Sequence, residues 1–335
     1  MEHGNELYDV TIIGGGPTGL YTAFYSSMRG LKTKVIEYLP QLGGKVSFFY
    51  PEKTIYDVPG FYKITGSNLI HQLKEQTESL KPTIVLGQQV QEIVKNSQGN
   101  YCLLTDNDEK HITKTVIVTA GDGIFKMRKM PLMETLKIEG KNLHYHLGKM
   151  ENFIGKNVVV SGGGSGAINW AIMIAEFAEH VTLVHTSEDF HAHPIDIERL
   201  HQSMVELKIP YSITDVNEDN GIIYEVVLKE EVTGMEERLP LDEMIAHHGA
   251  KLELGPLQET NIRFEKSKIV VDSSMATNLE GIYAAGDIVT YPNKNRLISG
   301  GFSEGVIAVN SATQYLDPSA PKTVYSTVIF GNKKK

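Results

Sequence analysis

The chain has 335 residues, of which 41% are hydrophobic and 22% are charged. This balance is typical of globular proteins and excludes a disordered chain, while the length indicates two domains. The formal net charge is −9, from 32 Lys and Arg against 41 Asp and Glu, so binding to nucleic acid or to an anionic membrane is not expected.

The first predicted unit is a strand, a glycine turn, a helix and a second strand, at Leu7–Ile13, 14–19, Leu20–Met28 and Thr33–Glu37. The turn reads Gly14-x-Gly16-x-x-Gly19. Its glycines permit a tight turn, close approach of a pyrophosphate and close packing of helix on strand. The helix N-terminus offers N–H groups to the phosphates, and Glu37 can accept hydrogen bonds from an adenosine ribose. Dinucleotide binding is predicted, with a ligand-free glycine turn as the alternative.

The same order of elements returns in the second half of the chain. Strand Asn157–Ser161 leads into Gly162-x-Gly164-x-x-Ala167, a helix to about Ala178 and strand Val181–Val184. His185 lies 23 residues after Gly162, which is the place that Glu37 takes after Gly14. An NAD site prefers an acid there and an NADP site prefers a nearby arginine. A nicotinamide dinucleotide is therefore predicted, and the choice between the two stays open.

Further strands are predicted at Val90–Thr105, His111–Thr119, Tyr211–Asn217, Ile222–Glu230 and Lys268–Asp272. The lone Cys102 falls in one of them, which favours a small core residue. His191 and His193 alternate on a loop without a suitable third ligand, so no metal site is expected. The acidic start of the chain does not resemble a signal peptide and no apolar stretch is long enough to span a bilayer, so a cytoplasmic protein is expected.

The C-terminal part contains a strand, Gly281–Ala285, that closes in Gly286-Asp287. A carboxylate at such a strand end can bind a ribityl hydroxyl of FAD. Downstream, Gly300–Gly305 is predicted to open a helix through about Ala312, and the N-terminus of that helix can stabilise an anionic reduced flavin.

Several motifs together resemble the thioredoxin-reductase-like ferredoxin–NADP(+) reductases, over nearly the whole chain. They are GGGPTG with Glu37, Leu42–Gly44, Tyr50–Lys53 with Tyr56–Gly60, Thr119–Gly121 and GIYAAGD at 281–287. The resemblance implies an α/β fold of two Rossmann-like, three-layer domains: an FAD domain at 1–118 plus 286–335, with an NAD(P)H domain inserted at 119–285. It also implies a homodimer that passes electrons through FAD between NADPH (with NADH possible) and ferredoxin or flavodoxin.

The resemblance also implies the site residues. Tyr50 would stack on one face of the flavin and Tyr325 on the other, where Tyr325 could act as a gate; a place in the dimer interface is the alternative for Tyr325. The residues implied for FAD are Gly14, Gly16, Thr18, Gly19, Glu37, Gln41, Gly44, Lys45, Tyr50, Val90, Phe125, Asp287, Ser303 and Ser326. Those implied for NAD(P)H are Gly162, Gly164, Ser165, Ala167 and His185.

The chain lacks two sets of residues that bear on this interpretation. Thioredoxin reductases need a CxxC pair, whereas Ile168–Ala171 follows the second glycine turn here, so exchange through two thiols of one chain is impossible. The family's arginines for the 2′-phosphate are also missing between His185 and His193. The alternatives are an NAD(P)H oxidase or diaphorase-like flavoenzyme, and a flavin-binding redox module with a decayed nicotinamide site. Lys126, Arg128 and Lys129 are the candidate basic patch for an acidic protein acceptor.

Overall fold

The structure is a computed structural model that describes residues 6–130, 141–145 and 150–331. The chain forms two compact units: unit 1 comprises residues 1–124 and 252–335, and unit 2 comprises residues 125–251. It passes between them over β9 (Ile124–Met127) and β18 (Ala250–Glu253), which pair with each other. These boundaries differ from the predicted 118/119 and 285/286, because Leu254, Ile269 and Met275 pack into the hydrophobic core of unit 1.

Unit 1 is built on a seven-stranded sheet with the order β5-β2-β1-β8-β7-β6, in which β21 also pairs with β8. Strands β5, β2, β1, β8 and β21 run parallel, while β6, β7 and β8 form an antiparallel meander. The bounds are β1 (Leu7–Ile13), β2 (Thr33–Glu37), β5 (Thr83–Leu86), β6 (Val90–Lys95), β7 (Tyr101–Thr105), β8 (Lys110–Val118) and β21 (Ile282–Ala284).

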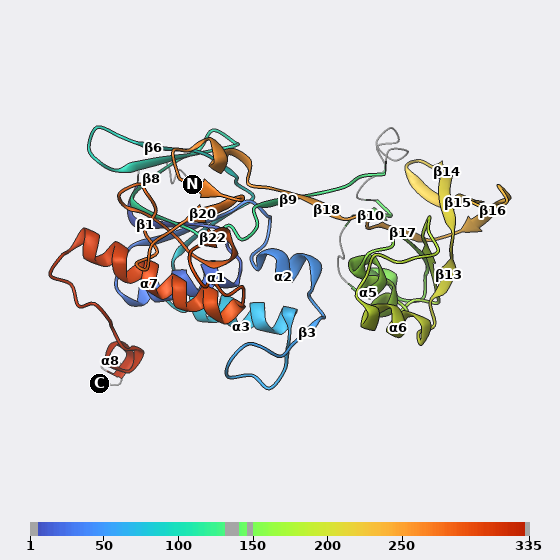
Figure 1. Cartoon of the computed structure of the whole chain (residues 1–335), viewed down its shortest axis with the longest axis horizontal. Coiled ribbons are helices and arrows are strands. Elements are labelled where there is room, and N and C mark those ends of the chain that lie inside the picture. Colours follow the sequence, from blue (N-terminus) through green and yellow to red (C-terminus); the bar gives the residue numbers. More distant parts are fainter. Residues whose placement is uncertain (1–5, 131–140, 146–149, 332–335) are drawn as a thin grey trace. The chain divides into compact units, whose positions relative to one another are not determined.

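Helices α1 (Pro17–Met28) and α7 (Ile298–Leu316) pack side chains into the core on this sheet. Helix α3 (Gly66–Glu78) contacts α1, and α2 (Gly44–Phe49) contacts α3. Helix α8 (Ser326–Gly331) lies apart from the sheet near the C-terminus (Figure 1). Short strands complete the unit: β3 (Thr54–Ile55) pairs with β4 (Ile64–Thr65), and β19 (Phe264–Glu265), β20 (Lys268–Val270) and β22 (Val289–Thr290) form a small sheet.

Helix α7 differs from the sequence prediction, because it begins at Ile298 rather than at Gly300 and ends at Leu316. Gly301 and Gly305 therefore lie inside its first turns. A Cβ atom on Gly301 would lie 2.3 Å from the hydroxyl oxygen of Thr18, and one on Gly305 would lie 2.2 Å from that of Thr22. These glycines let α7 approach α1 closely instead of opening the helix.

Unit 2 contains a parallel sheet with the order β10-β17-β11-β12-β13. Its strands are β10 (Leu143–His144), β17 (Glu243–Ala246), β11 (Asn157–Ser161), β12 (His180–Val184) and β13 (Glu206–Lys208), with α5 (Ser165–Ile174) and α6 (Pro194–His201) as helices. Helix α5 ends four residues before the predicted Ala178. An antiparallel sheet of β14 (Tyr211–Asp219), β15 (Ile222–Glu230) and β16 (Glu236–Pro240) follows. None of the helices in the described ranges is long and apolar enough to cross a membrane.

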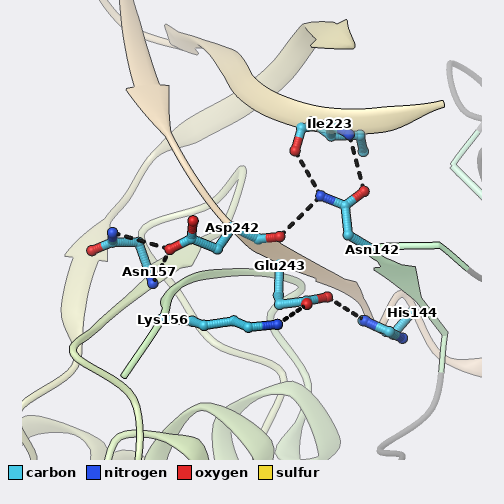
Figure 2. Close-up of polar contacts among 7 residues, drawn as sticks. All are labelled: Asn142, His144, Lys156, Asn157, Ile223, Asp242 and Glu243. Atoms are coloured by element: carbon cyan, nitrogen blue, oxygen red, sulfur yellow. Dashed lines mark hydrogen bonds and ion pairs between the residues drawn. The ribbon is translucent and has the colours of Figure 1, made fainter. Parts of the chain in front are cut away.

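Buried polar contacts join the amino ends of the parallel strands in unit 2 (Figure 2). The Glu243 carboxylate on β17 contacts the Nε2 of His144 at 2.7 Å and also pairs with Lys156. The Asn142 side chain donates to the carbonyls of Ile223 and Asp242, at 2.6 and 2.9 Å, and accepts from the Ile223 N–H at 3.0 Å. Asn142 thereby fixes the antiparallel sheet to the parallel one, at the amino ends of the parallel strands.

Candidate functional site

The glycine turn of unit 1 has the geometry of a phosphate cradle. Gly14 adopts φ +107°, and a Cβ atom there would lie 2.7 Å from the carbonyl oxygen of Thr119. A Cβ on Gly19 would lie 1.8 Å from the Gly14 carbonyl oxygen. Only glycine fits at these two positions, which agrees with the steric reasons that the sequence motif gave.

The helix N-termini separate two classes of helix. Helices α1, α2, α5 and α7 have Gly16, Gly43, Gly164 and Leu297 as N-cap residues, and none of these four has a side-chain cap. In contrast, α3 is capped by the Thr65 hydroxyl and α6 by the His193 imidazole. Three of these four uncapped helices, α1, α5 and α7, are the ones for which the sequence predicts phosphate or flavin binding at the N-terminus. Their free N–H groups and positive dipole ends suit an anionic ligand.

Glu37 ends β2 beside this turn and is 2% exposed. Its carboxylate accepts hydrogen bonds from the N–H of Gly15 at 2.6 Å and of Leu39 at 2.9 Å. Burial raises the pKa of Glu37 above its usual range, and the backbone donors oppose that shift. The side chain therefore braces the glycine turn and presents a carboxylate edge next to it, as expected for a ribose-binding acid.

A group of two lysines and two aspartates lies beside the same turn. Lys45 pairs with Asp122 and lies 3.4 Å from the Asp287 carboxylate, while Lys268 donates to Asp122 at 2.5 Å and to the Asp287 carbonyl at 2.6 Å. Burial opposes charging of both Lys45 and Asp122, but their mutual contacts prevail: the pKa of Lys45 is raised and that of Asp122 is lowered. Asp287 is thus held at a half-buried position beside the Lys45 ammonium. Sequence reasoning missed Asp122 and Lys268, which become neighbours only in the fold.

Direct contacts bring most of the predicted FAD residues together. The Gly43 N–H donates to the Gly15 carbonyl at 2.8 Å, which puts α2 with Gly44 and Lys45 against the turn. A Cβ on Gly286 would lie 2.9 Å from the Thr18 hydroxyl, which puts Asp287 beside the start of α1. The residues present therefore fit a dinucleotide such as FAD.

The other residues predicted to bind FAD lie outside the glycine turn of unit 1. Tyr50 follows α2, is 45% exposed and carries the Lys53 ammonium 5.2 Å from its ring centroid. Gln41 and Ser303 are exposed, whereas Val90 is buried in the core and Phe125 is buried on β9. Since the Val90 side chain packs in the core, its backbone alone is available to a ligand.

Tyr325 and Ser326 stand apart from the glycine turn. The segment before them is held by Arg29, at the carboxyl end of α1, whose guanidinium donates to the Pro321 carbonyl at 2.6 Å. Tyr325 is 68% exposed. The glycine turn lies at the opposite end of α1, so a role of Tyr325 over the flavin stays a prediction.

The second glycine turn borders a cavity of about 490 Å³ within unit 2. A Cβ on Gly163 would lie 2.1 Å from the His185 ring, and one on Gly166 would lie 2.4 Å from the His247 ring. The cavity is lined by Met130, Ser161–Gly166, Val184–Thr186, His191, Tyr211–Ile213 and His247–Gly249. Of the residues predicted to bind NAD(P)H, Gly162, Gly164, Ser165 and His185 line this cavity. The fifth, Ala167, is buried and does not line it.

Burial disfavours the cationic form of three histidines that line this cavity, His185, His247 and His248. His185 stacks on Phe190 with centroids 5.5 Å apart, and burial lowers its pKa below the ordinary value. Burial likewise lowers the pKa of His247, which packs edge-on to Trp170 at 4.4 Å, and of His248, which contacts the Ser161 hydroxyl at 3.1 Å. Sequence reasoning missed His247 and His248; the signal was their position directly after the short apolar strand β17.

No lysine or arginine is among the described residues that line this cavity. Arg199 on α6 donates to the Asn169 side chain at 3.3 Å instead. His193 caps α6, since its Nδ1 accepts from the Ile195 N–H. The adenosine end of a coenzyme would therefore meet neutral rings and hydroxyl groups.

Comparison with known proteins agrees with this architecture. Residues 8–312 match the family described as pyridine nucleotide-disulphide oxidoreductase. The chain is 45% identical to ferredoxin–NADP reductase 2 of Bacillus subtilis, over 99% of this chain and 100% of that protein. It is 44% identical to the ferredoxin–NADP reductase of Halalkalibacterium halodurans, over 96% and 97% of the two chains. Among solved structures, thioredoxin reductase of T. acidophilum shares the fold, with a TM-score of 0.70 at 24% identity over 94% of this chain and 99% of that one.

Proposed function

The chain belongs to the pyridine nucleotide-disulphide oxidoreductase family, and from this membership we propose that it is a flavoprotein that transfers electrons between NADPH and ferredoxin through FAD. The observation that carries the proposal is the pair of uncapped glycine turns, one in each unit, in a chain whose only cysteine is Cys102. Two-thiol chemistry of the thioredoxin reductase kind is excluded within one chain. Electrons must therefore leave the flavin for an external acceptor, and the names of the full-length relatives support ferredoxin in that role.

Bound FAD supplies the redox chemistry, because it accepts a hydride from the nicotinamide and releases electrons to a one-electron carrier. The chain supplies binding and electrostatics. The N–H groups of the α1 turn would hold the pyrophosphate, Glu37 the ribose and Asp287 the ribityl chain, while Tyr50 would cover one face of the ring. The turn from Gly162 to Ala167 would hold the coenzyme. Hydride transfer itself requires no general acid or base from the protein.

The acceptor and the assembly belong to the same proposal. Lys126 lies on β9, Arg128 and Lys129 follow that strand, and all three are exposed. Ferredoxins and flavodoxins are generally acidic, so either could dock there. A homodimer completes the proposal, and a supply of NADPH favours a cytoplasmic location.

Stopped-flow reduction tests the proposal. The purified yellow protein, kept anaerobic, is mixed with NADPH or NADH, and the bleaching of the flavin is followed before ferredoxin is added. We expect rapid bleaching by NADPH and reoxidation by ferredoxin. Protein that purifies colourless, or that no nicotinamide coenzyme reduces, would refute the proposed function.

The Asp287→Ala variant tests the FAD site separately. Loss of a charged acceptor for a hydroxyl costs about 1.5–3 kcal/mol, so the variant should lose FAD on dilution. Asp317→Ala is the matched control, because Asp317 is an exposed aspartate of unit 1 at the far end of α7. Equal retention of FAD by both variants would contradict the role of Asp287.

A further inference from the structure

Glu304 is a buried carboxylate to which the sequence motifs assign no role. It lies on α7 between Gly301 and Gly305, which pack against α1, and it is 3% exposed. One carboxylate oxygen accepts the N–H of Gly286 at 2.8 Å. The other accepts the Tyr291 hydroxyl and the Lys294 ammonium, both at 2.6 Å.

Lys294 and Tyr291 offset the energetic cost of burying the Glu304 carboxylate. Lys294 is itself buried, so its ammonium and the Glu304 carboxylate neutralise each other away from water. Burial, and then the hydrogen bond to Glu304, raise the pKa of Tyr291 to about 12, so its hydroxyl stays a donor at neutral pH. We call Glu304, Lys294 and Tyr291 the Glu304 anchor.

The anchor holds the backbone directly before Asp287. Gly286 has φ +86° and packs against Thr18, so this position is a tight turn that only glycine fits. Glu304 binds the N–H of Gly286 on one side, and Lys268 binds the Asp287 carbonyl at 2.6 Å on the other. The backbone that carries the Asp287 carboxylate is therefore fixed from both sides.

We propose that Glu304 is a positioning residue for FAD, which acts by holding the Gly286 N–H so that the Asp287 carboxylate points at the ribityl chain. This inference rests on the proposed function, since it assumes that Asp287 binds FAD. Lys294 and Tyr291 serve to hold the Glu304 carboxylate in the orientation that accepts from Gly286. The packing of α7 against α1 through Gly301 and Gly305 fixes the distance between the anchor and the glycine turn.

Two charge-neutral double variants isolate the hydrogen bond to Gly286. Glu304→Gln with Lys294→Met removes both buried charges but keeps an amide oxygen that can accept from Gly286. Glu304→Met with Lys294→Met removes the charges and the acceptor at nearly the same volume. We expect the first variant to bind FAD within about threefold of the unaltered protein and the second about tenfold more weakly, measured by fluorescence titration of the apoproteins.

A cycle with Asp287→Ala separates positioning from general stability. If Glu304 acts through Asp287, the tenfold difference between the two double variants disappears once Asp287 is alanine. If the role of Glu304 is purely structural, the tenfold difference in FAD affinity between the two double variants will be the same with Asp287 and with Asp287→Ala, and the proposal is overturned. Equal FAD binding by the two double variants with Asp287 intact would overturn it as well.

If the double variant Glu304→Met with Lys294→Met does not fold, hydrogen exchange at the Gly286 amide of the unaltered apoprotein tests whether Glu304 holds that amide. Slow exchange supports the anchor, and exchange as fast as that of exposed amides overturns it. Failure of the unaltered protein to bind FAD would instead contradict the proposed function, so the two outcomes are distinguishable.

Discussion

Coenzyme choice should respond strongly to one added charge, Thr186→Arg. Thr186 is exposed and lines the 490 Å³ cavity beside His185, in a lining without lysine or arginine. A charged hydrogen bond to a phosphate is worth about 1.5–3 kcal/mol, which corresponds to roughly 10–100-fold. Because the site is exposed and screened by solvent, we expect the lower end, about tenfold in favour of NADPH.

The unaltered protein should show a shallow preference for NADPH that grows as the pH falls. Burial lowers the pKa of His185 from its ordinary value near 6.5, so protonation, and with it attraction for a 2′-phosphate, sets in below that pH.

The assay is the ratio of kcat/KM for NADPH and NADH at pH 6 and pH 8, in the unaltered protein, in Thr186→Arg and in the uncharged control Thr186→Gln. The arginine variant should raise the ratio at both pH values, and the glutamine variant should leave it unchanged. A strong, pH-independent preference for NADPH in the unaltered protein would refute the reasoning and would point to another cation, such as Arg199. A strong preference for NADH would show that the family resemblance misleads at this site.

Three further predictions concern FAD and stability. Burial raises the pKa of Glu37, and a ribose hydroxyl needs the ionised carboxylate as acceptor, so FAD affinity should rise with pH through that pKa and then level off. The Glu37→Gln variant should bind FAD roughly 10–100-fold more weakly, with an affinity that no longer depends on pH in this range. A pH-independent FAD affinity of the unaltered apoprotein would contradict this prediction. Tyr325→Ala should change the flavin absorption envelope and the rate of hydride transfer if Tyr325 covers a flavin, whereas unchanged spectra and kinetics would place it elsewhere. Asn142→Ala should lower the free energy of unfolding of unit 2, measured in urea, by about 2 kcal/mol, because it leaves buried backbone groups without their partner. The control Asn157→Ala removes an exposed side chain and should lower the same free energy by less than about 0.5 kcal/mol. Equal losses in the two variants would refute the role of Asn142.

The sequence predicted the elements next to the glycine turns best. The bounds of β1, β2, β11 and β15 coincide with the prediction, because apolar runs there end at glycine or polar residues. The second copy of the motif also located His185 at the cavity by its spacing alone.

Other features depend on contacts that no local pattern reveals. β17 is a four-residue strand whose place between β10 and β11 brings His247 and His248 to the cavity. Asp122 and Lys268 meet across 146 positions of sequence. The start of α7 was missed because its N-cap is Leu297, which carries none of the side chains that mark a helix start.

The pairing of β21 with β8 has a consequence for synthesis of the chain. Val116–Val118 pair with Ile282–Ala284, so the sheet of unit 1 stays open along an apolar edge until unit 2 has been translated completely. An open edge of this kind invites association with other chains. A chain that stops before Ile282 therefore lacks the closing strand, and with it α7 and Asp287, the residue that the proposed function assigns to FAD. Only chains that have been translated through α7 should therefore bind FAD and be yellow, and fragments from the first half should precipitate without colour.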